Sequence, residues 1–437
     1  MRLYHNEKKT TLPFFLKFYH FIWLLALPLL KTSKRLKQGV EQRRSCDHLS
    51  KADLWIQAAS AGEAYLAVEL VKSLFPHQKT KILLTTTTSQ GMDILTKSLE
   101  KELINKHICI QTAWFPFDMP GIMKKAAALV NPEIMVLLET EIWPALIFSL
   151  KQNRAAVWII NGRLSEKSLK SYLYAPWLWK KLAPDLIMAI DWENAQRYKK
   201  VFNTSEFRLM KNIKFDSLVE KNQNRPIDFS CVIKPDTLLS ILASVRMEEE
   251  MDAAVILERI MAQDLNQVTA VFPRHMHRLF FWKDKLTAMG VNWQFKSKIK
   301  APVENNTVIL WDTFGELKQA YSLATAVFVG GSLKPLGGQN FIEPVICGAA
   351  TVTGPFLENF SFAGEALFKD KTVKKATSAL AVADFMIQVL RNPPDRKIIA
   401  KKGKKYIKAN QGGTKTACSA LENRLKNPGR SLFSIVF

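Results

Sequence analysis

The sequence predicts an α/β protein built from two doubly wound domains. The chain has 437 residues, of which 48% are hydrophobic. This length exceeds one ordinary domain and suits two domains of about 170 to 200 residues each. From residue 50 onward, short apolar runs alternate with helical patterns, which is typical of parallel sheets whose strands are joined by crossover helices.

The strand-like segments fall into two series. The first contains DLWIQAA, KILLTTTT, EIMVLLETE, AVWIING and DLIMAID, and the second contains LLSILASV, QVTAVFPRH, TVILWD, TAVFVGGS and ATVTGP. A polar stretch, EKNQNRPIDFS at 220–230, separates them. We therefore place an amino-terminal segment at 1–45, a first Rossmann-like domain at 46–218 and a second at 219–425.

The amino-terminal segment is apolar and aromatic. Residues 14–30 read FFLKFYHFIWLLALPLL and have Lys and Arg on both flanks. The segment is barely long enough to span a bilayer, and no small-residue cleavage site follows it, which argues against a secretory signal peptide. Its aromatic residues and basic flanks favour a helix anchored in the membrane or lying on it. An ordinary buried helix is the alternative.

Charge and cysteine content limit the class of protein. The formal charge of +23 and the pI near 9.7 imply an anionic partner, which is nucleic acid, a phosphate-bearing substrate or an anionic membrane surface. The five cysteines lie far apart and form no CxxC motif. This distribution favours a reducing compartment and argues against a zinc site or a disulfide framework.

A turn and helix start follow the first strand in WIQAASAGEAYLAVELVKSL, residues 55–74. In one interpretation, Ser60 and Gly62 only make the turn, and Glu63 is stabilised by the dipole of the following helix. In the other, Glu63 faces the crevice at the carboxyl end of the sheet, where ligands bind, and acts as a general base. This stretch alone leaves both open.

Further polar residues follow later strands of the first series. Glu139 and Glu141 come after MVLL, Arg163 comes after VWII, and Lys214 lies in NIKFD. Each has an ordinary alternative as a surface charge. Their shared placement with Glu63 at predicted strand ends favours a site in which carboxylates and a lysine supply a base and a charge stabiliser.

The second series carries candidate anion contacts. Pro273, Arg274 and His275 end one strand, and an arginine fork there suits a phosphate. In DTFGELKQAYSLA a loop leads into a predicted helix that contains Glu316, with Asp312 or Thr313 as its expected cap. The backbone N–H groups at this helix start equally suit an anion.

A Gly-rich loop in VFVGGSLKPLGGQNFIEPVICG leads to Asn340 and Glu343, and such glycines allow close approach to a nucleotide. The segment matches neither GxxxxGK[ST] nor GxGxxG. This difference disfavours NTP hydrolysis and dinucleotide chemistry.

These motifs together resemble a known family. SAGE, TTTTSQG, PFDMPG, NPEIMVLLETEIWP, NGRLSEKS, NIKFD, PRH, DTFGEL and GGSLKPLGGQNFIEP occur in the order found in bacterial 3-deoxy-D-manno-octulosonic acid (Kdo) transferases of lipid A assembly. The resemblance runs from about residue 14 to beyond 410. It implies a GT-B glycosyltransferase with two Rossmann-like domains facing a cleft, an amino-terminal membrane anchor, CMP-Kdo as donor and a lipid A precursor (lipid IVA) as acceptor. It also implies an inverting mechanism without a bound metal or cofactor, at the cytoplasmic face of the inner membrane.

The resemblance assigns roles to individual residues. Glu63 corresponds to the base that takes the proton of the acceptor hydroxyl, and Glu139 with Lys214 to the pair that stabilises the transition state. Residues implied to bind CMP are Pro273, Arg274, His275, Phe314, Gly315, Glu316, Asn340, Phe341, Ile342 and Glu343. Candidates for the acceptor or cleft are Ser60, Gly62, Glu141 and Arg163.

The chain also departs from the family pattern. It has Ala61 for Val, Lys211 for Gly, Phe314 for Met and Gln339 for His, and ASVRMEEE at 243–250 replaces a Ser-Thr-His pattern. Gln339 still donates a hydrogen bond but cannot titrate.

Two other functions compete with this assignment. One is a GT-B transferase for another nucleotide sugar or acceptor. The other is a membrane-associated nucleic-acid binder, suggested by the charge and by the basic run DRKIIAKKGKKYIK at 395–408. No nucleic-acid recognition motif accompanies this run. We therefore favour a solvated helix face that touches anionic lipid.

Overall fold

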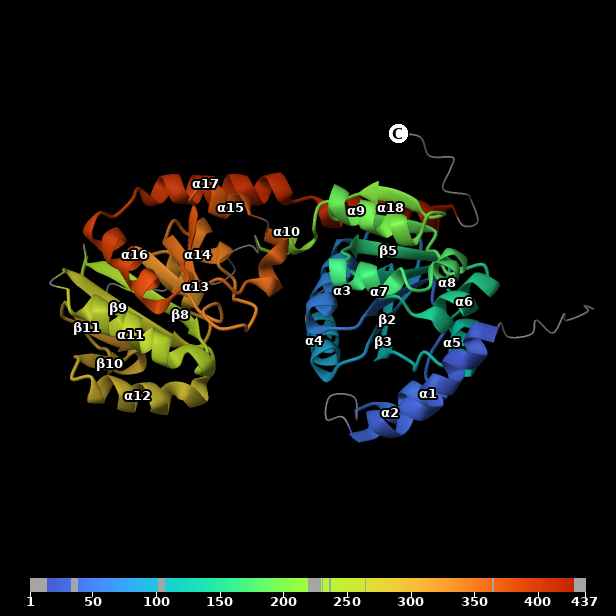
Figure 1. Cartoon of the computed structure of the whole chain (residues 1–437), viewed down its shortest axis with the longest axis horizontal. Helices are drawn as coiled ribbons and strands as arrows, with labels where there is room; N and C mark the ends of the chain where they lie inside the picture. Colours follow the sequence, from blue (N-terminus) through green and yellow to red (C-terminus); the bar gives the residue numbers. More distant parts are fainter. Residues whose placement is uncertain are drawn as a thin grey trace, which may run out of the picture. The chain divides into compact units, whose positions relative to one another are not determined.

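The computed structural model describes residues 14–32, 38–100, 107–218, 229, 231–235, 237–263, 265–363 and 365–427. They form two compact units (Figure 1). Unit 1 comprises the chain up to Ser217 and from Gln411 onward, and unit 2 comprises Leu218–Asn410. Each unit contains a seven-stranded parallel sheet, which confirms the predicted fold class of two Rossmann-like units.

The unit 1 sheet has the strand order β3-β2-β1-β4-β5-β6-β7. The connections change direction between β1 and β4, which pair through Leu54 and Ile134. Such a switch point opens a crevice at the carboxyl ends of the strands. The strands are β1 (Leu54–Ala58), β2 (Thr80–Thr86), β3 (Ile108–Trp114), β4 (Ile134–Leu138), β5 (Ala156–Gly162), β6 (Leu186–Ala189) and β7 (Glu206–Leu209).

Both faces of this sheet are covered by helices. Along β1, Trp55 packs into one apolar cluster while its neighbours Leu54 and Ile56 pack into another, because successive side chains of a strand point to opposite faces. The helices are α1 (Phe14–Thr32), α2 (Val40–Ser45), α3 (Ala61–Ser73), α4 (Ser89–Glu100), α5 (Pro120–Val130), α6 (Pro144–Gln152), α7 (Glu166–Tyr172), α8 (Pro176–Lys181), α9 (Trp192–Val201), α10 (Lys214–Ser217) and α18 (Gly413–Lys426).

Helix α1 packs on unit 1 with one face only. Leu16 is buried in the core, and the Tyr19 hydroxyl donates a hydrogen bond of 2.9 Å to the buried Asp118 carboxylate. Other hydrophobic side chains are exposed to solvent, namely Phe14, Phe18, Phe21, Ile22, Leu24 and Leu25. Among the helices of the described residues, none combines the length and hydropathy needed to cross a membrane.

The last helix, α18, belongs to unit 1 (Figure 1), whereas the sequence analysis groups residues 219–425 together. Its apolar face, which includes Cys418 and Leu421, joins the core that covers α3. The Asp216 carboxylate fixes its start by accepting 2.7 Å hydrogen bonds from the backbone N–H groups of Gly412 and Thr414. The amphipathic pattern of this helix is compatible with packing on either unit. Its position in unit 1 is therefore decided by tertiary contacts and not by its sequence pattern.

Unit 2 repeats the doubly wound plan with the strand order β10-β11-β9-β8-β12-β13-β14. Its switch point lies between β8 and β12, which pair through Ser240 and Ala326. The strands are β8 (Leu238–Val245), β9 (Gln267–Pro273), β10 (Trp293–Phe295), β11 (Thr307–Leu310), β12 (Ala326–Val329), β13 (Ala350–Thr353) and β14 (Val373–Lys375).

The helices of unit 2 cover its sheet and carry much of the basic charge. Helix α17 exposes Lys397, Lys401, Lys402, Lys404, Lys405 and Lys408 and contains no acidic residue. The helices are α11 (Glu250–Met261), α12 (Leu279–Ala288), α13 (Leu317–Tyr321), α14 (Ile342–Ile346), α15 (Ala366–Lys369), α16 (Ala379–Arg391) and α17 (Arg396–Asn410), with short 3₁₀ turns at Met247–Glu249, Met276–Arg278, Lys296–Lys298 and Glu358–Ala363.

Candidate active site

The switch point of unit 1 brings the predicted acidic residues to one edge of the sheet. Strands β1 and β4 are parallel neighbours, and Glu63 follows the first while Glu139 and Glu141 follow the second. The charge of Glu139 raises the pKa of Glu63, and the charges of Glu63 and Glu139 raise the pKa of Glu141, which indicates that the three carboxyl groups are close. The sequence-predicted grouping therefore exists in the folded unit.

Glu63 lies in the first turn of α3 and combines both roles considered from the sequence. The hydroxyl of Ser60 accepts a 3.3 Å hydrogen bond from the Glu63 N–H, and the Glu63 carboxylate accepts one of 2.6 Å from the Ala59 N–H. These bonds cap the helix. The side chain is only 9% exposed. Burial and the charge of Glu139 raise the pKa of Glu63 to about 7, against the opposing effect of these hydrogen bonds. A helix-capping carboxyl can therefore exchange a proton near neutral pH.

Glu139 occupies an unusual backbone conformation. Its φ is 56°, in the left-handed region that non-glycine residues adopt at a cost of about 1–3 kcal/mol. The surrounding structure holds it there: its N–H donates to the Ile160 carbonyl at 3.1 Å, and its own carbonyl accepts a 2.8 Å hydrogen bond from the Tyr198 hydroxyl. Strain of this kind concentrates at functional sites because it fixes the direction of a side chain.

Lys214 forms an ion pair with Glu139. Its ammonium nitrogen lies 2.6 Å from a Glu139 carboxylate oxygen, and both side chains are largely buried. The side chain of Asn212 accepts a 3.0 Å hydrogen bond from the Lys214 N–H, and the side chain of Asn161 accepts one of 3.0 Å from the N–H of Ile213. These two asparagines position the lysine. Both begin motifs quoted above, NGRLSEKS and NIKFD, but the sequence alone assigned them no role.

Glu141 is the third carboxyl group of the cluster. It accepts a 2.7 Å hydrogen bond from the Trp143 indole N–H. Burial, followed by the charges of Glu63 and Glu139, raises the pKa of Glu141 to about 8, although the tryptophan hydrogen bond opposes the shift. Interacting groups of this kind titrate as a set. The cluster therefore combines proton-exchanging carboxyl groups with one ammonium group.

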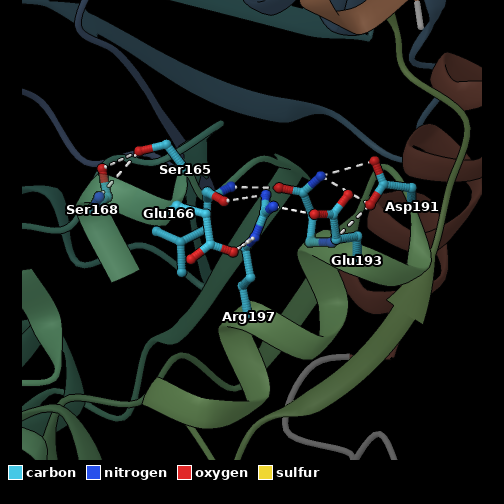
Figure 2. Close-up of polar contacts among 8 residues, drawn as sticks. Ser165, Glu166, Ser168, Asp191, Glu193 and Arg197 are labelled. Carbon is cyan, nitrogen blue, oxygen red and sulfur yellow. Dashed lines mark hydrogen bonds and ion pairs between the residues drawn. The ribbon is translucent and has the colours of Figure 1, made fainter. Parts of the chain in front are cut away.

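A polar network around Arg197 fixes the loop that follows β5 (Figure 2). Arg163 is the first residue of this loop. The Arg197 guanidinium donates to the Glu166 carboxylate at 2.9 Å and to the Leu164 carbonyl at 3.0 Å, and it also contacts Glu193. The Ser165 hydroxyl caps α7 by accepting a 3.1 Å hydrogen bond from the Ser168 N–H. The loop at the carboxyl end of β5 is thus braced from α9. Neither Arg197 nor Tyr198 was predicted, because both lie far along the chain on α9.

In unit 2, the predicted residues at the end of β9 are also at the carboxyl edge of the sheet. The Arg274 N–H donates to the Val245 carbonyl at 2.8 Å, which ties the ends of β8 and β9 together. The rings of His275 and His277 stack with their centroids 5.5 Å apart. Pro273 is the last residue of β9. This hydrogen bond therefore fixes the backbone of Arg274, the residue predicted to bind phosphate.

Among the predicted residues after β11, Phe314 is exposed to solvent, whereas the side chain of Glu316 is held by hydrogen bonds. Phe314 is 82% exposed, and Gly315 has a φ of 83°, which glycine adopts without strain. The Glu316 carboxylate accepts hydrogen bonds of 2.9 Å from Lys296, 2.8 Å from Trp311 and 2.6 Å from Thr313. Partial burial favours the neutral form of Glu316, but these hydrogen bonds outweigh it and lower the pKa of the carboxyl group. Its carboxylate is held as an anion that stiffens the loop.

The segment from Asn340 to Glu343 forms the start of α14. The Asn340 amide donates to the Glu343 carboxylate at 2.9 Å, and its carbonyl oxygen accepts from the Ile342 N–H at 3.1 Å. The side chains of Phe341 and Ile342 are wholly buried. In this segment the polar side chains available to a ligand are therefore those of Asn340 and Glu343, while Phe341 and Ile342 offer backbone groups.

Metal binding has little support in the described parts of the chain. No group of three or more His, Cys, Asp or Glu side chains there is arranged to hold a metal ion. The chemistry open to the unit 1 cluster is proton transfer by a carboxyl group together with stabilisation of charge by an ammonium group.

The chain is similar to known Kdo transferases. A family model described as 3-deoxy-D-manno-octulosonic-acid transferase (kdotransferase) matches residues 31–217. The curated 3-deoxy-D-manno-octulosonic acid transferase of Bordetella pertussis is 28% identical over 386 residues, which cover 86% of this chain and 88% of that protein. That of Haemophilus influenzae is 27% identical over 418 residues, covering 93% and 95%. The chain is therefore similar over most of its length to curated Kdo transferases, and residues 31–217 match their family model. The resemblance drawn from its motifs is thereby confirmed.

The similarity to these relatives supports a glycosyltransferase that acts in Kdo transfer for lipopolysaccharide biosynthesis. The solved structures agree on the fold. A glycosyltransferase from Rickettsia africae, 13% identical, covers 87% of this chain and 100% of its own with a TM-score of 0.56. The chain thus has the two Rossmann-like units of the GT-B fold.

Proposed function

We propose that the protein is an inverting transferase that moves Kdo from CMP-Kdo to a lipid A precursor, lipid IVA. The observation that carries this proposal is the Glu63 carboxyl group, which is buried beside the Glu139–Lys214 ion pair and has a pKa of about 7. In a single displacement, an acceptor hydroxyl gives its proton to the Glu63 carboxylate as its oxygen bonds to the anomeric carbon of Kdo. The bond from that carbon to the phosphate oxygen breaks, and CMP leaves as an anion.

In this proposal, the residues of the unit 1 cluster carry out the transfer chemistry, and residues of unit 2 bind the donor. Glu63 is the base, and Lys214 with Glu139 stabilises the charge that develops during transfer. Arg274, His275 and the backbone around Asn340 to Glu343 bind CMP. Because CMP leaves as an anion, it needs hydrogen-bond donors but no proton. Glu141 and Arg163 are proposed to face the acceptor.

Mass spectrometry of lipid IVA incubated with the protein and CMP-Kdo tests the proposal. A mass gain of one or more Kdo units supports it and counts the sugars added. Parallel incubations with CMP-sialic acid and UDP-sugars test the competing assignment to another nucleotide sugar. Transfer from one of those donors, and none from CMP-Kdo, would contradict our assignment.

Removal of the Arg274 side chain should weaken CMP binding. A charge-assisted hydrogen bond contributes about 1.5–3 kcal/mol, so Arg274→Ala is expected to lower CMP affinity by that amount in calorimetry. Thermal stability should stay nearly unchanged, because its backbone bond to Val245 is retained. Unaltered CMP affinity would show that the nucleotide does not lie over the end of β9.

We further propose that the protein is held at the cytoplasmic face of the inner membrane. The exposed apolar side of α1 supports this, since such a face can lie in the bilayer interface. The lysines of α17 suit anionic lipid headgroups and contribute about 1 kcal/mol each near such a surface. A nucleic-acid partner has no comparable support.

Changes to the exposed face of α1 should release the protein from membranes without unfolding it. We expect the triple variant Phe18→Ser, Phe21→Ser and Leu25→Ser to shift towards the soluble fraction, because only solvent-facing apolar area is removed. Wild type should resist washing with 1 M salt, in which the Debye length is about 3 Å. Phe75→Ser, which alters an exposed phenylalanine outside α1, is the control. Complete release of wild type by salt alone would contradict an apolar anchor.

A further inference from the structure

A buried carboxylate lies at the switch point of unit 2, outside the residues proposed to act in transfer. Glu249 follows β8 and has no exposed surface. The Gly-rich loop that begins at Gly330 follows β12, the parallel neighbour of β8. In a doubly wound sheet this position borders the ligand crevice.

The carboxylate of Glu249 is surrounded by backbone N–H donors. One oxygen accepts from Arg246 at 3.2 Å and also from Gly331. The other oxygen accepts from Ser332 at 3.2 Å and from Leu333 at 3.3 Å. Four backbone N–H groups thus converge on one anion.

The Gly-rich loop is shaped to this carboxylate. A side-chain carbon added at Gly330 would collide with a Glu249 oxygen and lie 2.9 Å from the Ser244 carbonyl oxygen, so only glycine fits there. Gly331 has a φ of 67°, which turns successive N–H groups towards one point. Successive N–H groups in such a turn form a nest that binds phosphate in other proteins. Here the chain itself supplies the anion.

This arrangement changes the interpretation of the loop drawn from its sequence. The glycines at 330 and 331 were expected to let the backbone approach a nucleotide. The N–H groups of Gly331, Ser332 and Leu333 are instead occupied by Glu249. Burial raises the pKa of Glu249, while these hydrogen bonds favour its ionised form.

The nest also determines the path of the chain towards the proposed donor residues. The Gly338 N–H donates to the Gly331 carbonyl at 2.7 Å, which closes the loop on itself. The Ser332 hydroxyl accepts a 2.8 Å hydrogen bond from the Gly354 N–H, which ties the same loop to the end of β13. Two residues after Gly338 the chain reaches Asn340, whose side chain accepts a hydrogen bond from the Ile342 N–H at the start of α14.

We propose that Glu249 is a positioning residue of the donor site, whose carboxylate fills the nest at 331–333 and holds the segment from Gly330 to Glu343 in its donor-binding shape. The proposal rests on the donor assignment made above. It also implies that other groups bind the donor phosphate, because the backbone N–H groups of the nest already donate to Glu249.

Chemical rescue tests this proposal. Glu249→Ala removes the carboxylate and leaves the nest empty, so we expect CMP affinity to fall about tenfold or more, in line with the loss of charge-assisted hydrogen bonds. Added formate should enter the nest and restore CMP affinity with a saturable dependence on its concentration. In transfer assays the KM for CMP-Kdo should rise while the KM for the acceptor stays the same.

Two further variants complete the design. Glu249→Gln keeps the volume of the side chain, so formate cannot enter, and we expect reduced CMP affinity without rescue. Glu258→Gln removes the same charge from an exposed position on α11 and should behave as wild type. If Glu249→Ala fails to fold, the CMP affinity of Glu249→Gln tests the proposal instead. Wild-type CMP affinity in that variant would overturn the proposal.

The outcomes separate this inference from the donor assignment. Wild-type CMP affinity in Glu249→Ala, or a loss that formate does not repair, would overturn the inference. Should the wild type not bind CMP at all, the donor assignment fails, and thermal unfolding still tests the nest. Formate should raise the Tm of Glu249→Ala but not that of wild type, and equal Tm values with and without formate would show that the nest takes no anion.

Discussion

Glu63→Gln should fold, bind CMP with wild-type affinity and lose transfer activity by a factor of about 10² to 10⁴, the range for removal of a general base. The amide oxygen of glutamine can still accept the hydrogen bond from the Ala59 N–H, so the start of α3 is retained. Burial favours the neutral carboxyl group, so the stability that it contributes is present below pH 4.5 and is lost as the pH rises through about 7. The neutral glutamine is therefore not expected to lower the Tm at pH 8.

The pH dependence of the wild type provides a second test of Glu63. Since the base must be ionised, kcat/KM should rise as the pH increases through about 7, the pKa of Glu63. This rise should be absent from the residual activity of Glu63→Gln. Glu69→Gln, six residues further along α3, is a matched control that should keep wild-type activity. Wild-type turnover by Glu63→Gln would leave this carboxyl group with its helix-capping role alone.

Lys214→Met should lower the transfer rate by a factor of about 10² to 10³, the range for loss of one charge-stabilising donor. The ammonium group lies 2.6 Å from the Glu139 carboxylate. Without it, the negative charge of Glu139 acts on Glu63 uncompensated, and the pKa of Glu63 should rise further. The increase of kcat/KM with pH should therefore move to higher pH in this variant.

An exposed neighbour supplies the control for Lys214→Met. Lys211 lies three positions earlier and is exposed, so Lys211→Met removes the same charge away from the cluster and should change neither the rate nor the pH profile. A lower rate in Lys214→Met with an unshifted profile would show that Lys214 does not influence Glu63 electrostatically.

The sequence predicts those features of the site that follow from strand ends. Glu63, Glu139 and Glu141 come directly after apolar runs, and parallel strands place their carboxyl ends at one edge. The structure joins Glu139 with Lys214 because the chain between them adds three more strands to the same sheet. The motif order, which led to the Kdo transferase resemblance, was equally accessible from the sequence.

Other features depend on tertiary structure and leave no local pattern. The left-handed φ of Glu139 is imposed by contacts with Ile160 and Tyr198, which are distant in the chain. Glu249 looks like any acidic residue at a helix start, and its role depends on Gly331 and its neighbours, about eighty positions later. The half-buried state of α1 likewise follows from its contact with Asp118.

The packing of α18 makes unit 2 an insertion within unit 1. The chain leaves unit 1 after Ser217 and returns at Gln411, and the hydrogen bonds from Gly412 and Thr414 to Asp216 place the exit and the return side by side. A module joined at two adjacent points can be exchanged by recombination without breaking the fold that receives it. In this architecture, unit 2, the proposed donor half, can be replaced during evolution while unit 1, the proposed acceptor half, keeps its core.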